Sequence, residues 1–237
     1  MPTLYPTADA EVYIHIGSNR SFLELTADPP PFYLSGYYQM VSGSGFSGLD
    51  ATIQVSKGPG WIYVDYMYQV RRYIVEFDTS GVNRAPVNAN LQIFGAAVGN
   101  DADIICVETT LQSNGSITGQ DFVGHNETNP VDYTETVSGS SISAAAFNPI
   151  NFIDTGLSAM GNLDRLQMTC MEATYDYARI EPPTWPPYPA GVKTLFLQDT
   201  DDNSYDTWQP KLSYTMRVPD KISSGKVIIK SGQLTIK

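Results

Sequence analysis

The sequence predicts an all-β protein built as an antiparallel β-sandwich, and three observations lead to this fold class. Apolar residues come in short runs bounded by clusters of Gly, Pro, Asn, Asp and Ser, which is typical of many strands joined by turns. Helical periodicity is scarce along the 237 residues. Hydrophobic residues make up 42% of the chain and aromatic residues 11%, enough to bury one large core, and sandwiches of this length commonly form one domain.

Each candidate strand is a run of β-branched, aromatic or aliphatic residues that ends at a turn signal. The ranges are 11–16, 33–40, 51–56, 61–68, 73–78, 89–96, 103–108, 134–137, 166–171, 194–198, 211–216, 226–230 and 233–237. Two short runs, 118–123 and 149–156, are predicted to be helical. The segment 180–191 (IEPPTWPPYPAG) contains five prolines. Because proline cannot donate to a strand ladder, we expect this segment to be an extended surface loop.

The end of the chain is expected to form a basic β-hairpin. The runs 226–230 (KVIIK) and 233–237 (QLTIK) are separated by Ser231-Gly232 alone, a two-residue link typical of a hairpin. Residues 218–237 contain four lysines and one aspartate, a net charge of +3, so residues 1–217 carry −14, given the total of −11. We therefore predict a sandwich over residues 1–217 and a C-terminal hairpin arm over residues 218–237. The lysines expected to contact an acidic surface, either of the same subunit or of a neighbouring one, are Lys221, Lys226, Lys230 and Lys237.

The net charge argues against nucleic acid and anionic membrane as partners, because phosphate binding needs clustered Lys and Arg. The first ten residues (MPTLYPTADA) have no basic and apolar signal region, and no run of about 18 apolar residues occurs in the chain. We therefore expect the protein to be made in the cytoplasm of its host, without a signal peptide. Cys106 and Cys170 each lie inside an apolar run, and in that compartment we expect buried free thiols rather than a disulfide.

The middle of the chain carries an ordered series of short motifs. They are RRY at 71–73, FDTS at 77–80, PVNANLQIF at 86–94, QDF at 120–122, LQM at 166–168, YDY at 175–177 and PKLSYT at 210–215. In this order and spacing, residues 60–216 resemble a jelly-roll module of tailed-phage virion proteins, a module related to carbohydrate-binding modules of secreted bacterial proteins. Asn88 stands where that group has a serine at the start of its second strand.

The resemblance implies a β-sandwich of jelly-roll type in a virion protein that oligomerises, with a trimer favoured. It does not extend to the residues before 50 or to those after Met216.

The Phe-Asp-Thr-Ser motif also has a physical explanation of its own. Asp78, Thr79 and Ser80 can bond backbone N–H groups at the strand end and form an Asx-type turn that ends the ladder. Val75 and Phe77 then share one face of the strand. We expect a structural role rather than a ligand contact, because no nucleophile or base is near in the sequence.

Aromatic residues suggest a binding surface. In the run 61–68 (WIYVDYMY) the even-numbered positions look like a core face, which leaves Trp61 and Tyr63 facing outward or against a partner. Trp185 and Tyr188 of the proline-rich loop and Trp208 are further candidates. These five residues suit either stacking on sugar rings or anchoring a protein interface.

The densest acidic segment, 199–206 (DTDDNSYD), has three interpretations. Oxygen ligands at this density suit Ca²⁺, although the Gly and the terminal Glu of an EF-hand loop are missing. A pair of carboxylates such as Asp201 and Asp206 would suit glycoside hydrolysis. The third interpretation is a solvated turn between two strands. The candidate calcium ligands are Asp199, Asp201, Asp202, Asn203 and Asp206, and no other cofactor is expected.

Other patterns that indicate catalysis are scarce. The only histidines are His15 and His125, and neither lies beside a Cys or a second His. The run 42–46 (SGSGF) lacks the strand-to-helix context of a nucleophile elbow. We therefore expect that the protein is not an enzyme.

These observations lead to a hypothesis of function. We expect a phage virion structural protein, a capsid decoration or cement protein that binds the capsid surface and stabilises it. Its partners would be the major capsid protein or another virion protein and further copies of itself, and neither nucleic acid nor membrane. The alternative is a glycan-binding module or adhesin that serves host attachment from the virion.

Overall fold

The computed structural model describes residues 1–18, 22, 37–41, 51–59, 66–97, 102–111, 117, 121–122, 124–126, 128–183, 193–197, 209–217, 228–230 and 233–235. Its strands are β1 (Thr3–Leu4), β2 (Pro6–Ser18), β3 (Tyr37–Val41), β4 (Ala51–Pro59), β5 (Tyr66–Asp78), β6 (Asn88–Ala97), β7 (Ile104–Glu108), β8 (Phe147–Asn151), β9 (Arg165–Glu172), β10 (Lys193–Leu197), β11 (Lys211–Thr215), β12 (Ile228–Lys230) and β13 (Gln233–Thr235). Its helical elements include α2 (Asp154–Asn162) and a π-helical turn (Ala173–Tyr177).

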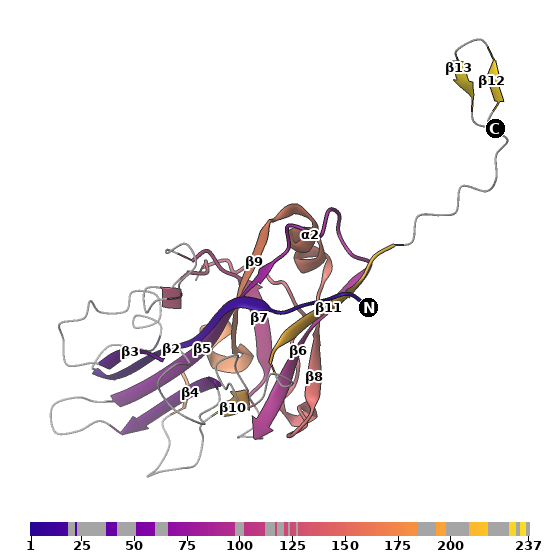
Figure 1. Cartoon of the computed structure of the whole chain (residues 1–237). Helices are drawn as coiled ribbons and strands as arrows, with labels where there is room; N and C mark the ends of the chain where they lie inside the picture. Colours follow the sequence, from indigo (N-terminus) through magenta and orange to yellow (C-terminus); the bar gives the residue numbers. More distant parts are fainter. Residues whose placement is uncertain are drawn as a thin grey trace.

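Two antiparallel four-stranded sheets face each other as a β-sandwich (Figure 1). The first, which we call the β6 sheet, has the order β1-β11-β6-β8. The second, which we call the β5 sheet, contains β5, β9 and β7 in that order. The segment 131–137 completes it, because this segment runs antiparallel to β7 through the bridges Ile104–Val137 and Val107–Asp132.

The strand pairings are nested along the chain. β1 pairs with β11, β5 with β9, β6 with β8, and β7 with the segment 131–137. One long antiparallel ribbon folded over on itself produces such nesting, and this is the connectivity of a jelly roll. The fold class predicted from the sequence, an all-β antiparallel sandwich of jelly-roll type, is confirmed.

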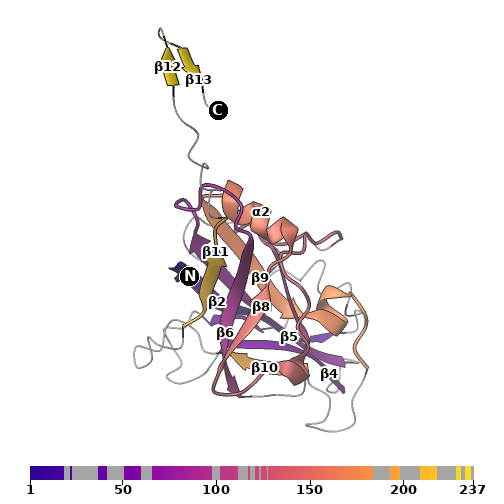
Figure 2. The same ribbon diagram turned by 90° about the vertical axis from the view of Figure 1, so that its right-hand side faces the viewer.

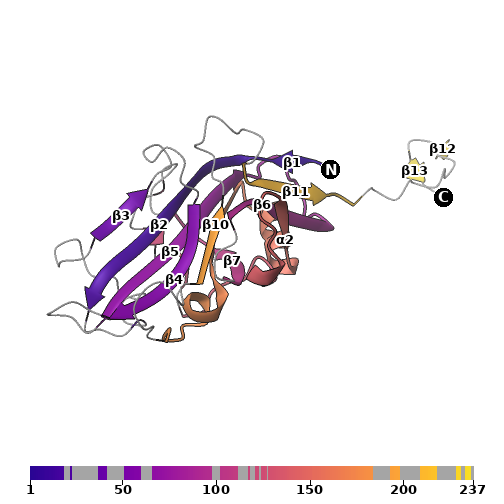
Figure 3. The ribbon, with the colours of Figure 1, turned by 90° about the horizontal axis from the view of Figure 1, so that it is seen from below.

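Four further strands enlarge the β5 sheet beyond the sandwich. β2 pairs with β5 along its whole length, and β3 continues the sheet on the far side of β2. β4 pairs with the first half of β5, and β10 pairs both with β4 and with the end of β6. Figure 3 shows β3, β2, β5, β4 and β10 side by side, so that β10 joins the two sheets at this end.

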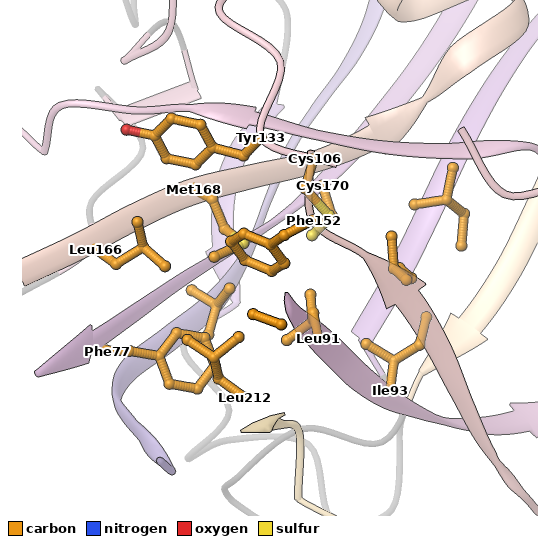
Figure 4. Close-up of a cluster of buried hydrophobic side chains, with 14 of the residues drawn as sticks. Phe77, Leu91, Ile93, Cys106, Tyr133, Phe152, Leu166, Met168, Cys170 and Leu212 are labelled. Atoms are coloured by element: carbon orange, nitrogen blue, oxygen red, sulfur yellow. The ribbon is translucent and has the colours of Figure 1, made fainter. Parts of the chain in front are cut away.

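The core lies between the two sheets, and strand alternation decides which side chains enter it. Val75 and Phe77 point inward from β5 and are fully buried, so they share one face, as the sequence predicts. Figure 4 shows where side chains from the two sheets meet. The labelled residues on strands of the two sheets are Phe77, Cys106, Leu166, Met168 and Cys170 from the β5 sheet and Leu91, Ile93 and Leu212 from the β6 sheet.

A second apolar layer covers the outer face of the β5 sheet. Ile74 of β5 packs there with Leu111, Ile117 and Phe122 of the connection after β7, and Phe22 joins the same cluster. The β5 sheet is therefore buried on both faces. This explains why β5 reads as a continuous apolar run at 73–77 (YIVEF), interrupted only by a buried glutamate.

Two sequence predictions about element boundaries are wrong. The runs 61–68 and 73–78 are predicted as separate strands, whereas β5 is one strand that passes through Arg71 and Arg72. The predicted helix at 149–156 is misplaced, because Pro149 lies in β8 and α2 begins at Asp154. Proline is tolerated in β8 because β8 lies at the edge of the β6 sheet.

The C-terminal hairpin predicted from the sequence is confirmed. β12 and β13 pair in antiparallel fashion, and Lys230 lies opposite Gln233, as a two-residue link requires. Within the described part of the chain, neither strand pairs with any other. The division of the chain at residue 217 into two domains stays a prediction.

Candidate interaction surface

Most residues predicted to form a site lie outside the described part of the chain. They are the aromatic residues Trp61, Tyr63, Trp185, Tyr188 and Trp208, the acidic-loop residues Asp199, Asp201, Asp202, Asn203 and Asp206, and the arm lysines Lys221, Lys226 and Lys237. Lys230 is described as the last residue of β12. The roles of all these residues stay predictions, so the candidate surface rests on other residues.

Neither a metal centre nor a membrane-spanning helix is found among the described residues. They contain no group of three or more His, Cys, Asp or Glu residues close enough to hold a metal ion. No helix in the described ranges is long and apolar enough to cross a membrane.

The predicted Asx-type turn at the end of β5 is confirmed. The backbone N–H of Ser80 donates to Asp78 Oδ1 at 2.9 Å, and the Ser80 hydroxyl donates to the same oxygen at 2.6 Å. These two hydrogen bonds lower the pKa of Asp78 below its usual value. The buried Thr79 hydroxyl donates to the carbonyl of Leu163 at 2.5 Å, so the turn is tied to the connection between α2 and β9.

A buried ion pair explains why β5 continues through two arginines. Arg72 and Asp176 are both fully buried, and the guanidinium donates to the two carboxylate oxygens at 2.8 and 2.6 Å. Arg72 also donates to the carbonyl of Phe122 at 2.6 Å and lies over the ring of Phe122, 3.9 Å from its centroid. The pair therefore fastens the layer that contains Phe122 to the outer face of the β5 sheet.

Glu172 positions the aspartate of this pair. Its carboxylate accepts backbone N–H groups of Thr174 and Tyr175 at 2.9 and 2.7 Å and so caps the π-helical turn that carries Asp176. Burial raises the pKa of Glu172, and the hydrogen bonds from these N–H groups oppose that rise. Both acids are thus occupied in holding the fold together.

A second carboxylate fixes where the proline-rich loop begins. Glu181 accepts the hydroxyl of Tyr68 at 2.6 Å and the backbone N–H of Phe22 at 2.7 Å. Tyr68 belongs to β5 and is buried, but in the second apolar layer on the outer face of the β5 sheet rather than in the core between the sheets. The start of the loop predicted to carry Trp185 and Tyr188 is therefore anchored to the rigid β5 sheet.

The outer face of the β6 sheet has a different character, because amide and hydroxyl side chains form rows across it. The register places Thr3, Ser213, Asn90 and Asn151 side by side on four neighbouring strands. Figure 2 looks onto this sheet, with β11, β6 and β8 turned toward the viewer. The next rows pair Thr215 with Asn88 and place Gln92 between Lys211 and Pro149.

Charge sets this face apart from the rest of an acidic protein. Among the outward-facing described residues of these four strands, Lys211 alone carries a formal charge. Its ammonium lies 3.7 Å from the centroid of the Phe147 ring, and Phe147 meets Phe94 edge to face at 5.4 Å. The result is a polar face without acidic side chains that ends in an aromatic pair, and we call it the amide face.

Exposure differs sharply between the outer faces of the two sheets. On the β5 sheet, outward residues such as Arg72, Ile74 and Thr169 are fully buried beneath other segments. On the amide face, Thr3, Asn88, Pro149 and Asn151 are exposed, Asn90, Gln92, Lys211 and Thr215 are partly exposed, and only Ser213 among the described polar residues of the rows is buried. The amide face is therefore the sheet surface that the described structure leaves accessible to a partner.

The alternation of polar and apolar residues in three strands predicts part of the amide face. The run 88–92 (NANLQ) alternates amide and apolar residues, and 211–215 (KLSYT) and 147–151 (FNPIN) also mix polar and apolar residues. Each run shows at most that one side of a strand is polar. Which strands lie next to each other, and hence that the polar sides form one surface, depends on the sheet order.

The two cysteines are free and fully buried, as the sequence predicts. They lie opposite each other on β7 and β9, and burial together with the neighbouring thiol raises the pKa of Cys170. We expect neither thiol to react with a soluble disulfide reagent in the folded protein, whereas both react once guanidinium unfolds it, because the thiolate is the reactive form. A rapid reaction of the reagent with the folded protein, measured by its absorbance, would contradict the burial of the two thiols.

The chain matches no protein-family model and no curated protein. Its function is therefore inferred from the jelly-roll fold and the amide face.

Proposed function

We propose that this chain is a phage virion structural protein, a capsid decoration protein that binds the capsid surface through the amide face and thereby stabilises it. In this proposal the protein acts by binding rather than by catalysis, and it is located in the virion. The observation that supports it most is the amide face, an accessible sheet surface without acidic side chains on a chain of net charge −11. The jelly-roll connectivity agrees with the motif resemblance but does not distinguish functions by itself.

Physical reasons favour an assembly interface on this face. With a net charge of −11, copies of this protein repel one another and repel acidic partners. The free-energy cost of forming an interface is therefore lowest on a surface where no carboxylate has to lose its hydration. Amide and hydroxyl groups can donate and accept at once and therefore adapt to a partner's backbone groups. The strands beneath them are held by the sandwich core, so little ordering is required on binding.

A single isosteric substitution tests the amide face. We expect Asn151→Asp to weaken binding to purified capsids by about tenfold or more, because a carboxylate without a cation opposite it would lose its hydration within the interface. The assay is co-sedimentation of the protein with capsids prepared without it from the virus that encodes the chain. Asn162→Asp, which adds the same charge on the exposed side of α2, is the matched control and should bind like the original protein.

Two results would contradict the proposal. One is that the unmodified protein shows no saturable binding to such capsids. The other is that Asn151→Asp binds as tightly as the Asn162→Asp control.

A second function, glycan binding, is favoured by one observation on the same surface. Amide and hydroxyl side chains can form hydrogen bonds with sugar hydroxyls, and here they lie in rows. The Phe94–Phe147 pair lies at the end of these rows. A glycan array distinguishes the two functions. If the protein binds defined glycans, loses that binding on Asn151→Asp and does not bind capsids, the adhesin is favoured.

A further inference from the structure

An open groove lies at the end of the sandwich where β11 ends. Its volume is about 630 Å³, within the range of roughly 300–1,000 Å³ that is typical of pockets for small ligands or a few side chains. One wall is the turn after β5 and the other is the end of β11. The lining residues are Gly81, Val82, Asn83, Arg84, Tyr214 and Met216.

Apolar side chains contribute to the floor and the rim of this groove. Val82 is buried in the sandwich core, and Tyr214 and Met216 pack against that core while keeping part of their surface exposed. Val87 is 48% exposed, and its backbone N–H donates to the carbonyl of Thr215 at 2.9 Å, which places it beside the same strand end. The groove therefore offers an incoming segment apolar contacts beside the polar groups of Asn83 and Arg84.

The C-terminal arm, residues 218–237, starts at this groove. Met216 lines the groove, and the guanidinium of Arg84 donates a hydrogen bond to the carbonyl of Arg217, the last residue before the arm. The position from which the arm departs is thus held by a residue of the groove itself.

The arm carries an apolar hairpin that is too small to be stable alone. β12 and β13 have three residues each, and within the described strands they pair only with each other. Isolated two-stranded hairpins are marginally stable in water. The register places Ile229 opposite Leu234, and directly opposite residues of antiparallel strands share a face. Apolar residues Val227 and Ile236 continue that alternation in the sequence.

We propose that the hairpin of one copy docks into the groove of a second copy, so that neighbouring subunits are linked by their arms. Figures 1 to 3 all show β12 and β13 beyond the end of their own sandwich. The ten residues 218–227 can span at most roughly 33–36 Å, which is enough to reach a neighbouring subunit. Such a head-to-tail contact closes into a ring when the rotation between the subunits permits it.

Charge assists the encounter between arm and body, while the contact itself is apolar. The arm carries +3 and residues 1–217 carry −14, so arm and body attract at long range. At the groove, Arg84 and Arg217 offer no attraction to lysines. The docked state then depends on contacts between the apolar residues of the hairpin and Val82, Tyr214 and Met216. This inference is independent of whether the amide face binds a capsid.

Two single variants and their mixture test the arm exchange. Asn83→Trp fills the groove from an exposed turn position, and Ile229→Lys removes the apolar contact of the hairpin and brings a like charge to Arg84. By light scattering, we expect the unmodified chain to form an oligomer and each variant to be monomeric. A single cooperative thermal transition in each variant would show that both still fold.

Mixing the two variants distinguishes exchange between copies from other modes. The Ile229→Lys chain retains an intact groove and the Asn83→Trp chain retains an intact hairpin, so a one-to-one complex is expected to form. A monomeric unmodified chain overturns the inference, as do variants that remain oligomeric. The inference is also overturned if the unmodified chain is an oligomer, both variants are monomers, and the two variants do not combine when mixed. In that case the hairpin docks elsewhere or on its own subunit.

Discussion

Replacing Asp176 by Asn is expected to lower the free energy of unfolding by about 3–5 kcal/mol, because it leaves the guanidinium of Arg72 buried without its counter-charge. Both side chains of the pair are fully buried, and Arg72 cannot reach water to recover its hydration. The substitution keeps the shape of the side chain and removes its charge. Chemical denaturation of the variant and the original protein measures the difference.

A neighbouring ion pair provides the matched control. Arg165 approaches Glu76 at 3.3 Å but is 57% exposed, and Glu76 also accepts hydrogen bonds from Thr7 and Gln167. Arg165→Gln should therefore cost less than about 1 kcal/mol. The double variant Arg72→Met with Asp176→Leu should recover most of the lost stability, because two apolar side chains leave no charge buried. Equal losses for Asp176→Asn and Arg165→Gln would contradict the proposed anchor.

Gly161→Ala is the second substitution with a large expected effect, a loss of about 1–3 kcal/mol in the free energy of unfolding. A Cβ at position 161 would collide with backbone atoms of Arg84 and Ala85, which cannot move aside as a flexible side chain can. The collision should outweigh the gain of roughly 0.5–1 kcal/mol that alanine normally brings to a helix. Thermal or chemical unfolding of the variant tests the close approach of α2 to the turn after β5.

Another glycine of the same region serves as the control. A Cβ added at Gly81 would meet no atom within 4 Å, so Gly81→Ala should change the stability by no more than about 0.5 kcal/mol. If Gly161→Ala proved as stable as Gly81→Ala, α2 would not pack closely on residues 84–85.

Local sequence patterns predicted much of the sandwich. The strand end at Phe77-Asp78-Thr79-Ser80 follows from short-range chemistry, because Asp78 bonds residues only two positions away. The same holds for the pairing of β12 with β13, which needs only a two-residue link. β6 and β11 were also predicted to within a residue or two, because their apolar residues alternate.

The sequence prediction failed where a contact with a distant part of the chain decides whether a strand continues. Two adjacent arginines look like the end of a strand, yet β5 continues because Asp176, more than a hundred positions away, neutralises Arg72. Pro149 likewise looks like a helix start, and only the edge position of β8 allows it in a strand. The candidate aromatic, acidic and lysine sites from the sequence stay predictions, because almost all of them lie outside the described residues.

The sequence by itself determined the all-β class, the acidic body with its basic hairpin, and the burial of the two cysteines, because each of these depends on composition or on near neighbours in the chain. Only the tertiary structure decided the nested strand order, the buried Arg72–Asp176 pair and the amide face. The physical reason is that each of these requires knowing which strands become neighbours. Thr3, Ser213, Asn90 and Asn151 come from four separate parts of the chain, and only the sheet order places them in one row.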